Sequence, residues 1–146
     1  FGDSLPRLDR WTINPTLAKL SEEVIDERNQ EFPRCHPGLN SKPYQFGYAL
    51  RAEGKSFPSI LKHDLKTGES TSFEFGAGRH GAEPIFVPRD GAEAEDDGFL
   101  MTFVYDEKSA ASELLIADAR DLTRPALASI HVPRVPYGFH GNWLPD

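Results

Sequence analysis

The chain has 146 residues, of which 38% are hydrophobic and 27% charged, a balance typical of soluble proteins. The net charge of −7 disfavours binding to nucleic acid, because phosphate binding needs clustered lysine and arginine. The apolar runs are far shorter than the roughly 20 residues of a membrane-spanning helix. Cys35 is the single cysteine, which excludes an internal disulfide and indicates a reducing, cytoplasmic compartment. Since the first residue is Phe1 rather than methionine, we expect a piece of a longer protein.

Short strands followed by turn signals are expected along the whole chain. Alternating aromatic and apolar residues predict a half-buried strand over 44–52. Turn sequences separate 59–65 from 70–75 and 99–105 from 113–119, which predicts two hairpins. Further strands are expected at 11–14, 20–28, 85–87 and 126–132. For residues 20–28 a short helix is the alternative.

About nine short strands and no long helix indicate an all-β protein. The architectures that fit are a sandwich, a barrel or the blades of a propeller. No sequence repeat is clear, so propeller blades would have diverged from one another. The acidic segment 91–98 is expected to be a solvated connection. A calcium site is the alternative there, although the spacing of an EF-hand loop is absent.

The last ten residues, 137–146, combine aromatic side chains, two glycines and His140. The segment is apolar enough that we expect it to be buried, with the glycines letting the backbone turn on both sides of His140. His140 is then either a packed core histidine or a metal ligand. The other four histidines lack the spacing of a zinc motif and are interpreted as surface residues: His36, His63, His80 and His131.

Two glutamates, Glu31 and Glu83, stand among apolar residues and prolines at the start of expected strands. A carboxylate in such surroundings should have a buried partner. One candidate partner is an arginine, Arg34 or Arg89. The other is the N–H of a metal-bound imidazole, whose tautomer and ring angle the carboxylate would fix. The residues alone leave both alternatives open.

The sequence resembles the carotenoid oxygenase family, the carotenoid and stilbene cleavage dioxygenases, and is most similar to its bacterial members. The resemblance rests on L-P-R at 5–7, E-F-P-R at 31–34, Tyr48, L-K-H-D-L at 61–65, G-A-E-P-I-F-V-P at 81–88, E-D-D-G at 95–98 and Y-G-F-H-G at 137–141. At His63 the family more often carries a tyrosine. The match runs from end to end. It implies that residues 1–146 are the C-terminal part of a single seven-bladed β-propeller domain.

The resemblance also implies a metal centre of ferrous iron, Fe(2+), held by four histidines, three of which are supported by glutamates. His140 matches the last of these ligands, and Glu83 matches the glutamate that supports it. Glu31 matches the glutamate that supports an earlier histidine, which lies outside this chain together with the other two ligands. Phe86 and Phe139 are expected to line or support an apolar substrate tunnel, with propeller core as their alternative role.

The implied reaction of the intact enzyme uses O2 to cleave one C=C bond of a carotenoid, apocarotenoid or stilbene into two carbonyl products. The isolated chain is expected to be inactive and to aggregate through its open sheet edges. Two alternatives remain: a non-catalytic propeller or sandwich that serves as a binding module, and a family member that isomerises its substrate. Peripheral contact with a membrane would involve regions outside these residues.

Overall fold

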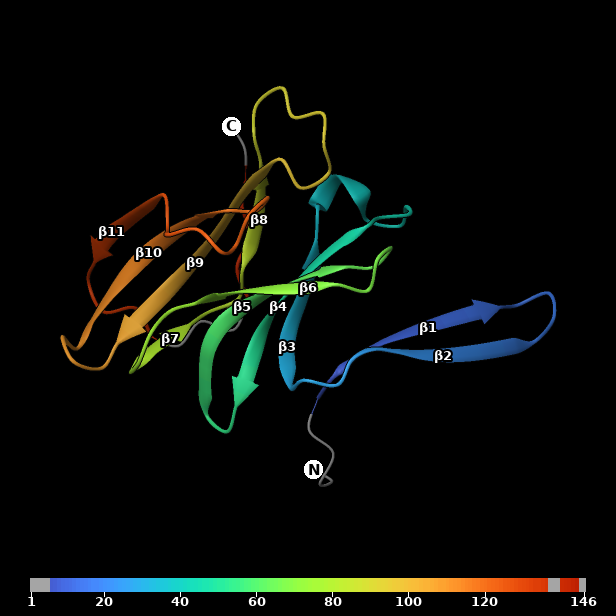
Figure 1. Cartoon of the computed structure of the whole chain (residues 1–146), viewed down its shortest axis with the longest axis horizontal. Helices are drawn as coiled ribbons and strands as arrows, with labels where there is room; N and C mark the ends of the chain where they lie inside the picture. The colour runs from blue at the N-terminus through green and yellow to red at the C-terminus, as the bar shows by residue number, and fades with distance from the viewer. Residues whose placement is uncertain (1–5, 137–139, 145–146) are drawn as a thin grey trace.

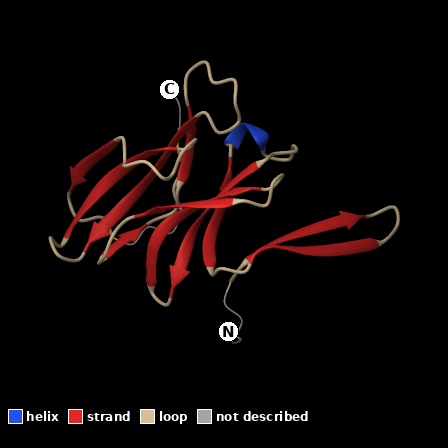
Figure 2. Cartoon of the chain, in the orientation of Figure 1, coloured by secondary structure: helices blue, strands red, loops and turns tan. Residues whose placement is uncertain are grey.

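The computed structural model describes residues 6–136 and 140–144. In these residues eleven strands and one short 3-10 helix form, so the all-β prediction is confirmed (Figure 2). Within 20–28, residues 20–26 form a strand rather than a helix, and residues 27 and 28 lie beyond its end. Only a strand start near Glu31 was predicted for β3 (Gln30–Cys35), and β7 (Arg79–Gly81) was not predicted at all. The first contains a proline, which usually argues against a strand, and the second has only three residues. No helix among the described residues is long and apolar enough to cross a bilayer.

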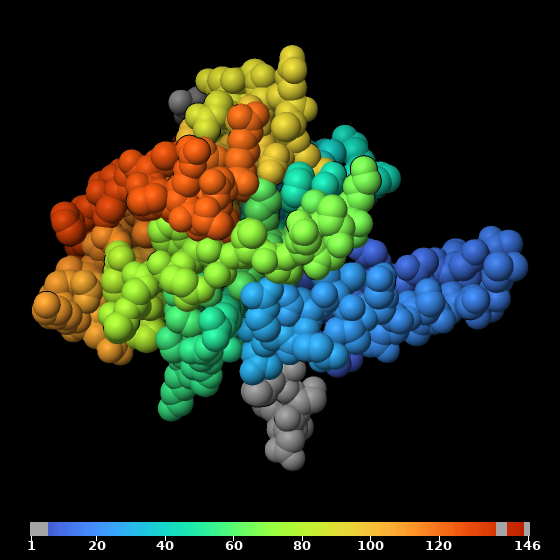
Figure 3. Space-filling model, viewed as in Figure 1, coloured from blue at the N-terminus to red at the C-terminus, as the bar shows by residue number. Residues whose placement is uncertain are grey.

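Strands β1 (Leu8–Asn14) and β2 (Lys19–Asp26) form an antiparallel hairpin that projects from the rest of the molecule (Figures 1 and 3). Its register pairs Ile13 with Leu20, and these side chains share one face of the ribbon with Trp11. All three are more than half exposed. A two-stranded ribbon is marginally stable alone and has half the strands of a propeller blade, so the hairpin is an incomplete sheet.

The second sheet is a four-stranded antiparallel meander in the order β3-β4-β5-β6. Its further strands are β4 (Phe46–Glu53), β5 (Ser56–Asp64) and β6 (Ser70–Glu74). The 3-10 helix η1 (Pro37–Leu39) lies in the connection between β3 and β4. Strands β5 and β6 are the first predicted hairpin. The meander has the strand number and order of one propeller blade.

The third sheet has the order β11-β10-β9-β7, and β8 also pairs with β9. Its further strands are β8 (Ile85–Pro88), β9 (Gly98–Asp106), β10 (Ala111–Asp118) and β11 (Ala128–Val132). Strands β9 and β10 are the second predicted hairpin. Strand β7 pairs with one end of β9 and β8 with the other, so the edge is interrupted over residues 82–84. The sheets remain open, as expected for part of a propeller.

The hydrophobic core lies between the second and third sheets, which are side by side in Figure 1. It joins Leu50 and Ile60 from the second sheet to Leu100 and Leu115 from the third. The sheets approach so closely that a Cβ added to Gly81 would lie 2.3 Å from the Phe75 ring. A glycine is therefore required at that position.

The acidic segment 91–98 is not the solvated connection that was expected. The Glu95 carboxylate accepts the backbone N–H groups of Gln45 and Phe46, and Asp96 forms a 2.6 Å ion pair with the nearly buried Lys62. The ammonium of Lys62 also donates to the Ala119 carbonyl at 2.8 Å. The acids of this segment thus connect the two sheets. The composition of the segment gave no sign of this, because the partners come from distant strands.

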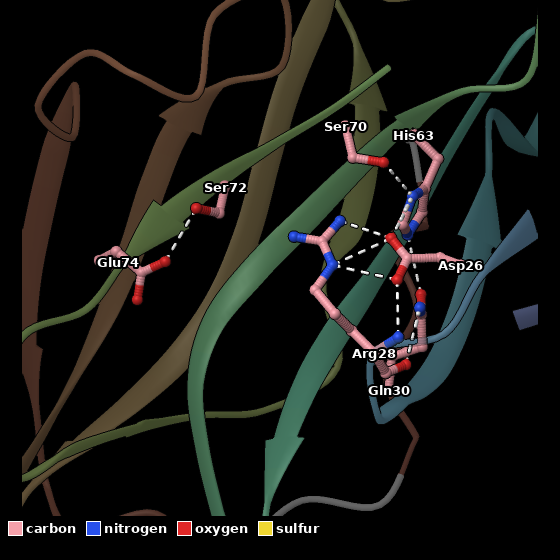
Figure 4. A network of polar contacts seen from close by, with 7 residues as sticks. All are labelled: Asp26, Arg28, Gln30, His63, Ser70, Ser72 and Glu74. Carbon is pink, nitrogen blue, oxygen red and sulfur yellow. Dashed lines mark hydrogen bonds and ion pairs between the residues drawn. The ribbon is translucent and has the colours of Figure 1, made fainter. Parts of the chain in front are cut away.

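His63 is buried rather than on the surface, with 1% of the residue exposed. Its Nε2–H donates to Gln30 Oε1 at 2.8 Å, and its Nδ1 lies 2.8 Å from the Ser70 hydroxyl. Figure 4 shows Asp26 and Arg28 beside this ring, where the end of β2 meets β5 and β6. The neutral ring thus has a partner at each nitrogen. Burial lowers the pKa of His63; Asp26 opposes this effect, and Arg28 lowers the pKa further.

We expect His63 to make the stability of the full-length protein sensitive to acid. Its pKa is lower in the folded than in the unfolded protein, so below about pH 6.5 the unfolded chain takes up the proton first. As the pH is lowered, the free energy of unfolding should therefore decrease more steeply in the wild type than in His63→Gln. Urea unfolding at pH 8 and pH 5 measures this difference, with the exposed His131→Gln as control. Parallel losses in wild type and His63→Gln would contradict the prediction.

Candidate functional site

The structure brings His140 and Glu83 together from distant parts of the chain. Glu83 lies in the interruption between β7 and β8, where the backbone is fixed by the Ala82 N–H donating to the Phe103 carbonyl at 2.8 Å. His140 follows β11 and lies against this interruption, with its Nδ1 3.2 Å from Glu83 Oε1. The exposed fractions of the side chains are 60% for His140 and 4% for Glu83. A buried carboxylate therefore supports an imidazole that faces outwards.

The Glu83 carboxylate accepts hydrogen bonds on both oxygens. Arg34 Nε donates to Oε1 at 2.8 Å and Arg34 Nη2 to Oε2 at 3.0 Å. The Gly141 N–H donates to Oε2 at 2.8 Å. Burial by itself would raise the pKa of Glu83, but the donors Arg34, Gly141 and His140 outweigh it and hold the pKa below its usual value. The carboxylate is thus an ionised acceptor.

The sequence offered two kinds of partner for Glu83, an arginine and an imidazole, and the carboxylate contacts both. Arg34 forms the ion pair, whereas Arg89 pairs with Asp97 instead. The imidazole of His140 takes the remaining position on Oε1. Sequence reasoning missed the contribution of Gly141, since a backbone N–H carries no signal in the residue type.

The arrangement defines the tautomer and orientation of the His140 ring. An ionised carboxylate can only accept, so Nδ1 carries a proton, and in the neutral form of the ring the lone pair is on Nε2. The ring of Phe32 meets the imidazole edge-on, with centroids 5.7 Å apart. The segment around His140 was expected to be buried, but Trp143 is 48% and Leu144 80% exposed. Phe139 lies outside the described residues.

The remaining predicted site residues lie elsewhere. Glu31 is half-buried on β3 beside Leu50, and within the described ranges its carboxylate forms no hydrogen bond or ion pair. Phe86 is 2% exposed, and its ring stacks on Tyr48 with centroids 5.6 Å apart. Phe86 also borders a hollow of about 630 Å³ on the side of Trp143. The roles of Glu31 and Phe86 at a metal or substrate remain predictions.

A second hollow, of about 330 Å³, lies directly beside His140. Its walls are mostly apolar and come from β8, β9, β10 and the C-terminal segment, with Ile85, Met101, Phe103, Leu114 and Trp143 among them. Among the described residues, the ionisable side chains on its wall are Glu83 and His140. It offers room for an apolar group next to the imidazole.

The described residues fit one histidine ligand of a metal centre together with its supporting carboxylate. Among residues 6–136 and 140–144, no group of three or more His, Cys, Asp or Glu side chains is arranged to hold a metal ion. The Glu83 oxygens are occupied by donors, so this carboxylate fits the role of support and His140 that of ligand.

The chain is similar in sequence and fold to known proteins. The family model described as retinal pigment epithelial membrane protein matches residues 2–145. The chain is 41% identical to a carotenoid cleavage oxygenase of Mycobacterium tuberculosis, over 99% of this chain and 30% of the relative. It is 39% identical to apocarotenoid-15,15'-oxygenase of Synechocystis, over 94% of this chain and 29% of that enzyme.

A solved structure has the same fold. The cobalt-substituted Synechocystis apocarotenoid oxygenase superposes with a TM-score of 0.90 at 38% identity, covering 94% of this chain and 30% of that one. That neighbour therefore accepts cobalt. The chain spans about a third of the length of the curated relatives it matches.

Proposed function

The chain belongs to the carotenoid oxygenase family, and on this premise we propose that it forms part of an Fe(II)-dependent dioxygenase. The proposed reaction cleaves one C=C bond of a carotenoid, apocarotenoid or stilbene and gives two carbonyl products. The single observation that carries the proposal is the 3.2 Å contact between His140 Nδ1 and the buried, ionised Glu83 carboxylate. It orients a neutral imidazole with its lone pair on Nε2, which is the form that binds a metal.

The residues of this chain would contribute one ligand and its supports. His140 would donate Nε2 to the metal, and Glu83 would keep the proton on Nδ1 and fix the ring angle. Glu31 would support an earlier histidine in the same way, since its half-buried carboxylate forms no polar contact in the described residues. The chemistry that iron supplies when bound is the activation of O2. As an isolated piece with one of the four ligands, the chain would be inactive.

The hollow beside His140 suits an apolar, conjugated substrate. Its wall is formed by aliphatic and aromatic side chains such as Met101 and Leu114, which would exclude water next to the imidazole. Phe86, which borders the other hollow, of about 630 Å³, would support the substrate tunnel there, and we extend the same role to Phe139. A conjugated chain lies flat against such walls without leaving polar atoms unpaired.

The test is conversion of substrate by the full-length protein. The protein is reconstituted with Fe(II) and incubated in air with an apocarotenal and, separately, with a hydroxystilbene, and products are separated by chromatography and mass spectrometry. We expect two carbonyl products from at least one substrate and none under anaerobic conditions. Geometric isomers alone would replace the proposal with an isomerase. Binding without conversion would replace it with a binding module.

We expect Glu83→Gln to weaken metal binding by roughly 10–100-fold, the usual cost of losing a carboxylate behind a ligating histidine. The amide oxygen could still accept one hydrogen bond, but the amide NH2 would face the donors Arg34 and Gly141. Metal content after dialysis against a chelator measures the effect. The matched control is Glu107→Gln, which removes a carboxylate 2.9 Å from His80. Equal metal retention in both variants would refute the supporting role of Glu83.

A further inference from the structure

Arg34 forms hydrogen bonds both to Glu83 and to the backbone next to His140. Its Nε and Nη2 form the two-pronged contact with Glu83, and Nη2 also donates to the Gly141 carbonyl at 2.8 Å. The Gly141 N–H in turn donates to Glu83. One guanidinium therefore holds both the carboxylate that orients His140 and the backbone carbonyl of the next residue, Gly141.

A β-bulge puts Arg34 in this position. In the β3–β4 ladder Glu31 pairs with Leu50 and Arg34 with Tyr48, so three steps along β3 match two steps along β4. Directly paired residues point to the same face of a sheet, and Leu50 and Tyr48 share a face. Arg34 is thus on the same face as Glu31, whereas in a regular strand residues three apart point to opposite faces.

The bulge has a conformational cost that its function would explain. Phe32 lies inside it with φ of 56°, in the left-handed region that residues with side chains rarely adopt. The same residue places its ring against His140. Bulges that redirect side chains are common beside functional sites. The segment 31–34 therefore directs both Phe32 and Arg34 towards the imidazole.

We propose that Arg34 is a positioning residue of the metal centre, which sets the orientation of the His140 ring through Glu83 and Gly141. This inference rests on the proposed function. The role requires the shape of a guanidinium as well as its charge, because three acceptor atoms are held by two nitrogens in a fixed plane. A lysine ammonium would keep the charge but could not reproduce this geometry.

The test compares Co(II) binding by full-length apoprotein variants, followed by titration and by the visible d–d absorption of the bound ion. We expect Arg34→Lys and Arg34→Met to bind Co(II) roughly 10–100-fold more weakly than wild type, with a shifted d–d spectrum. The matched control is Arg89→Met, which removes an arginine of similar exposure paired with Asp97. That variant should keep the wild-type affinity and spectrum. If Arg34→Met does not fold, Arg34→Lys decides the question.

The outcomes separate this inference from the function it rests on. Wild-type affinity and spectrum in Arg34→Lys would overturn the positioning role, as would equal changes in Arg89→Met. If His140→Ala loses Co(II) while Arg34→Lys does not, only the inference fails. If His140→Ala binds Co(II) as tightly as wild type, the proposed metal centre itself is wrong.

Discussion

Replacement of His140 by alanine in the full-length protein is expected to abolish metal retention and turnover together. The side chain is the one imidazole in the described chain that meets the buried Glu83 carboxylate. Loss of a supporting residue alone costs roughly 10–100-fold in metal affinity, so loss of the ligand should cost at least about 100-fold. Metal analysis after gel filtration and product formation from an apocarotenal measure the two effects.

The control for this prediction is His131→Ala, which removes an exposed histidine from β11. It should retain wild-type metal content and activity. Full iron occupancy in His140→Ala would remove this residue from the ligand set. Loss of metal in both variants would indicate a general effect on folding.

Leu100→Ala is expected to destabilise the full-length protein by about 3 kcal/mol, within the range of roughly 2–5 kcal/mol for buried leucines. Leu100 is fully buried between the second and third sheets, where it belongs to the main hydrophobic cluster. It pairs with Ala117 on β10 and with Phe86 on β8, so the cavity would open at the centre of the third sheet. The midpoint of urea unfolding measures the loss.

The matched control is Leu17→Ala, because Leu17 is 69% exposed in the turn of the β1–β2 hairpin. This variant removes the same atoms from a site that is not buried in the described chain, and should change stability by no more than about 0.5 kcal/mol. Equal losses in the two variants would contradict the assignment of the core.

The pairing of Glu83 with His140 could be predicted from the sequence, whereas the part that Arg34 plays in it could not. Glu83 and His140 were identifiable because each is an unusual residue type for its surroundings, and the family resemblance paired them. Arg34 was identified as one of two candidate ion-pair partners and as part of the E-F-P-R motif, without a role at His140. The bulge that directs it was hidden, because no sequence pattern marks the positive φ of Phe32.

The histidines and acids show the same limit. His63 was expected on the surface because its sequence neighbours Lys62 and Asp64 are charged, yet it is buried by Gln30 and Ser70 from other strands. Within the acidic segment, Glu95 caps two backbone N–H groups of the second sheet. Burial and pairing of this kind depend on distant partners, and local composition does not report them.

The sequence by itself determined the all-β class, the two hairpins at 59–75 and 99–119, and the family. Alternation and turn residues are local signals, and motif spelling is read directly from the chain. Only the tertiary structure decided which face of β3 carries Arg34, how Glu83 fills the gap between β7 and β8, and that His140 faces outwards. These features follow from strand register and from contacts between residues far apart in the sequence, which arise only when the sheets pack together.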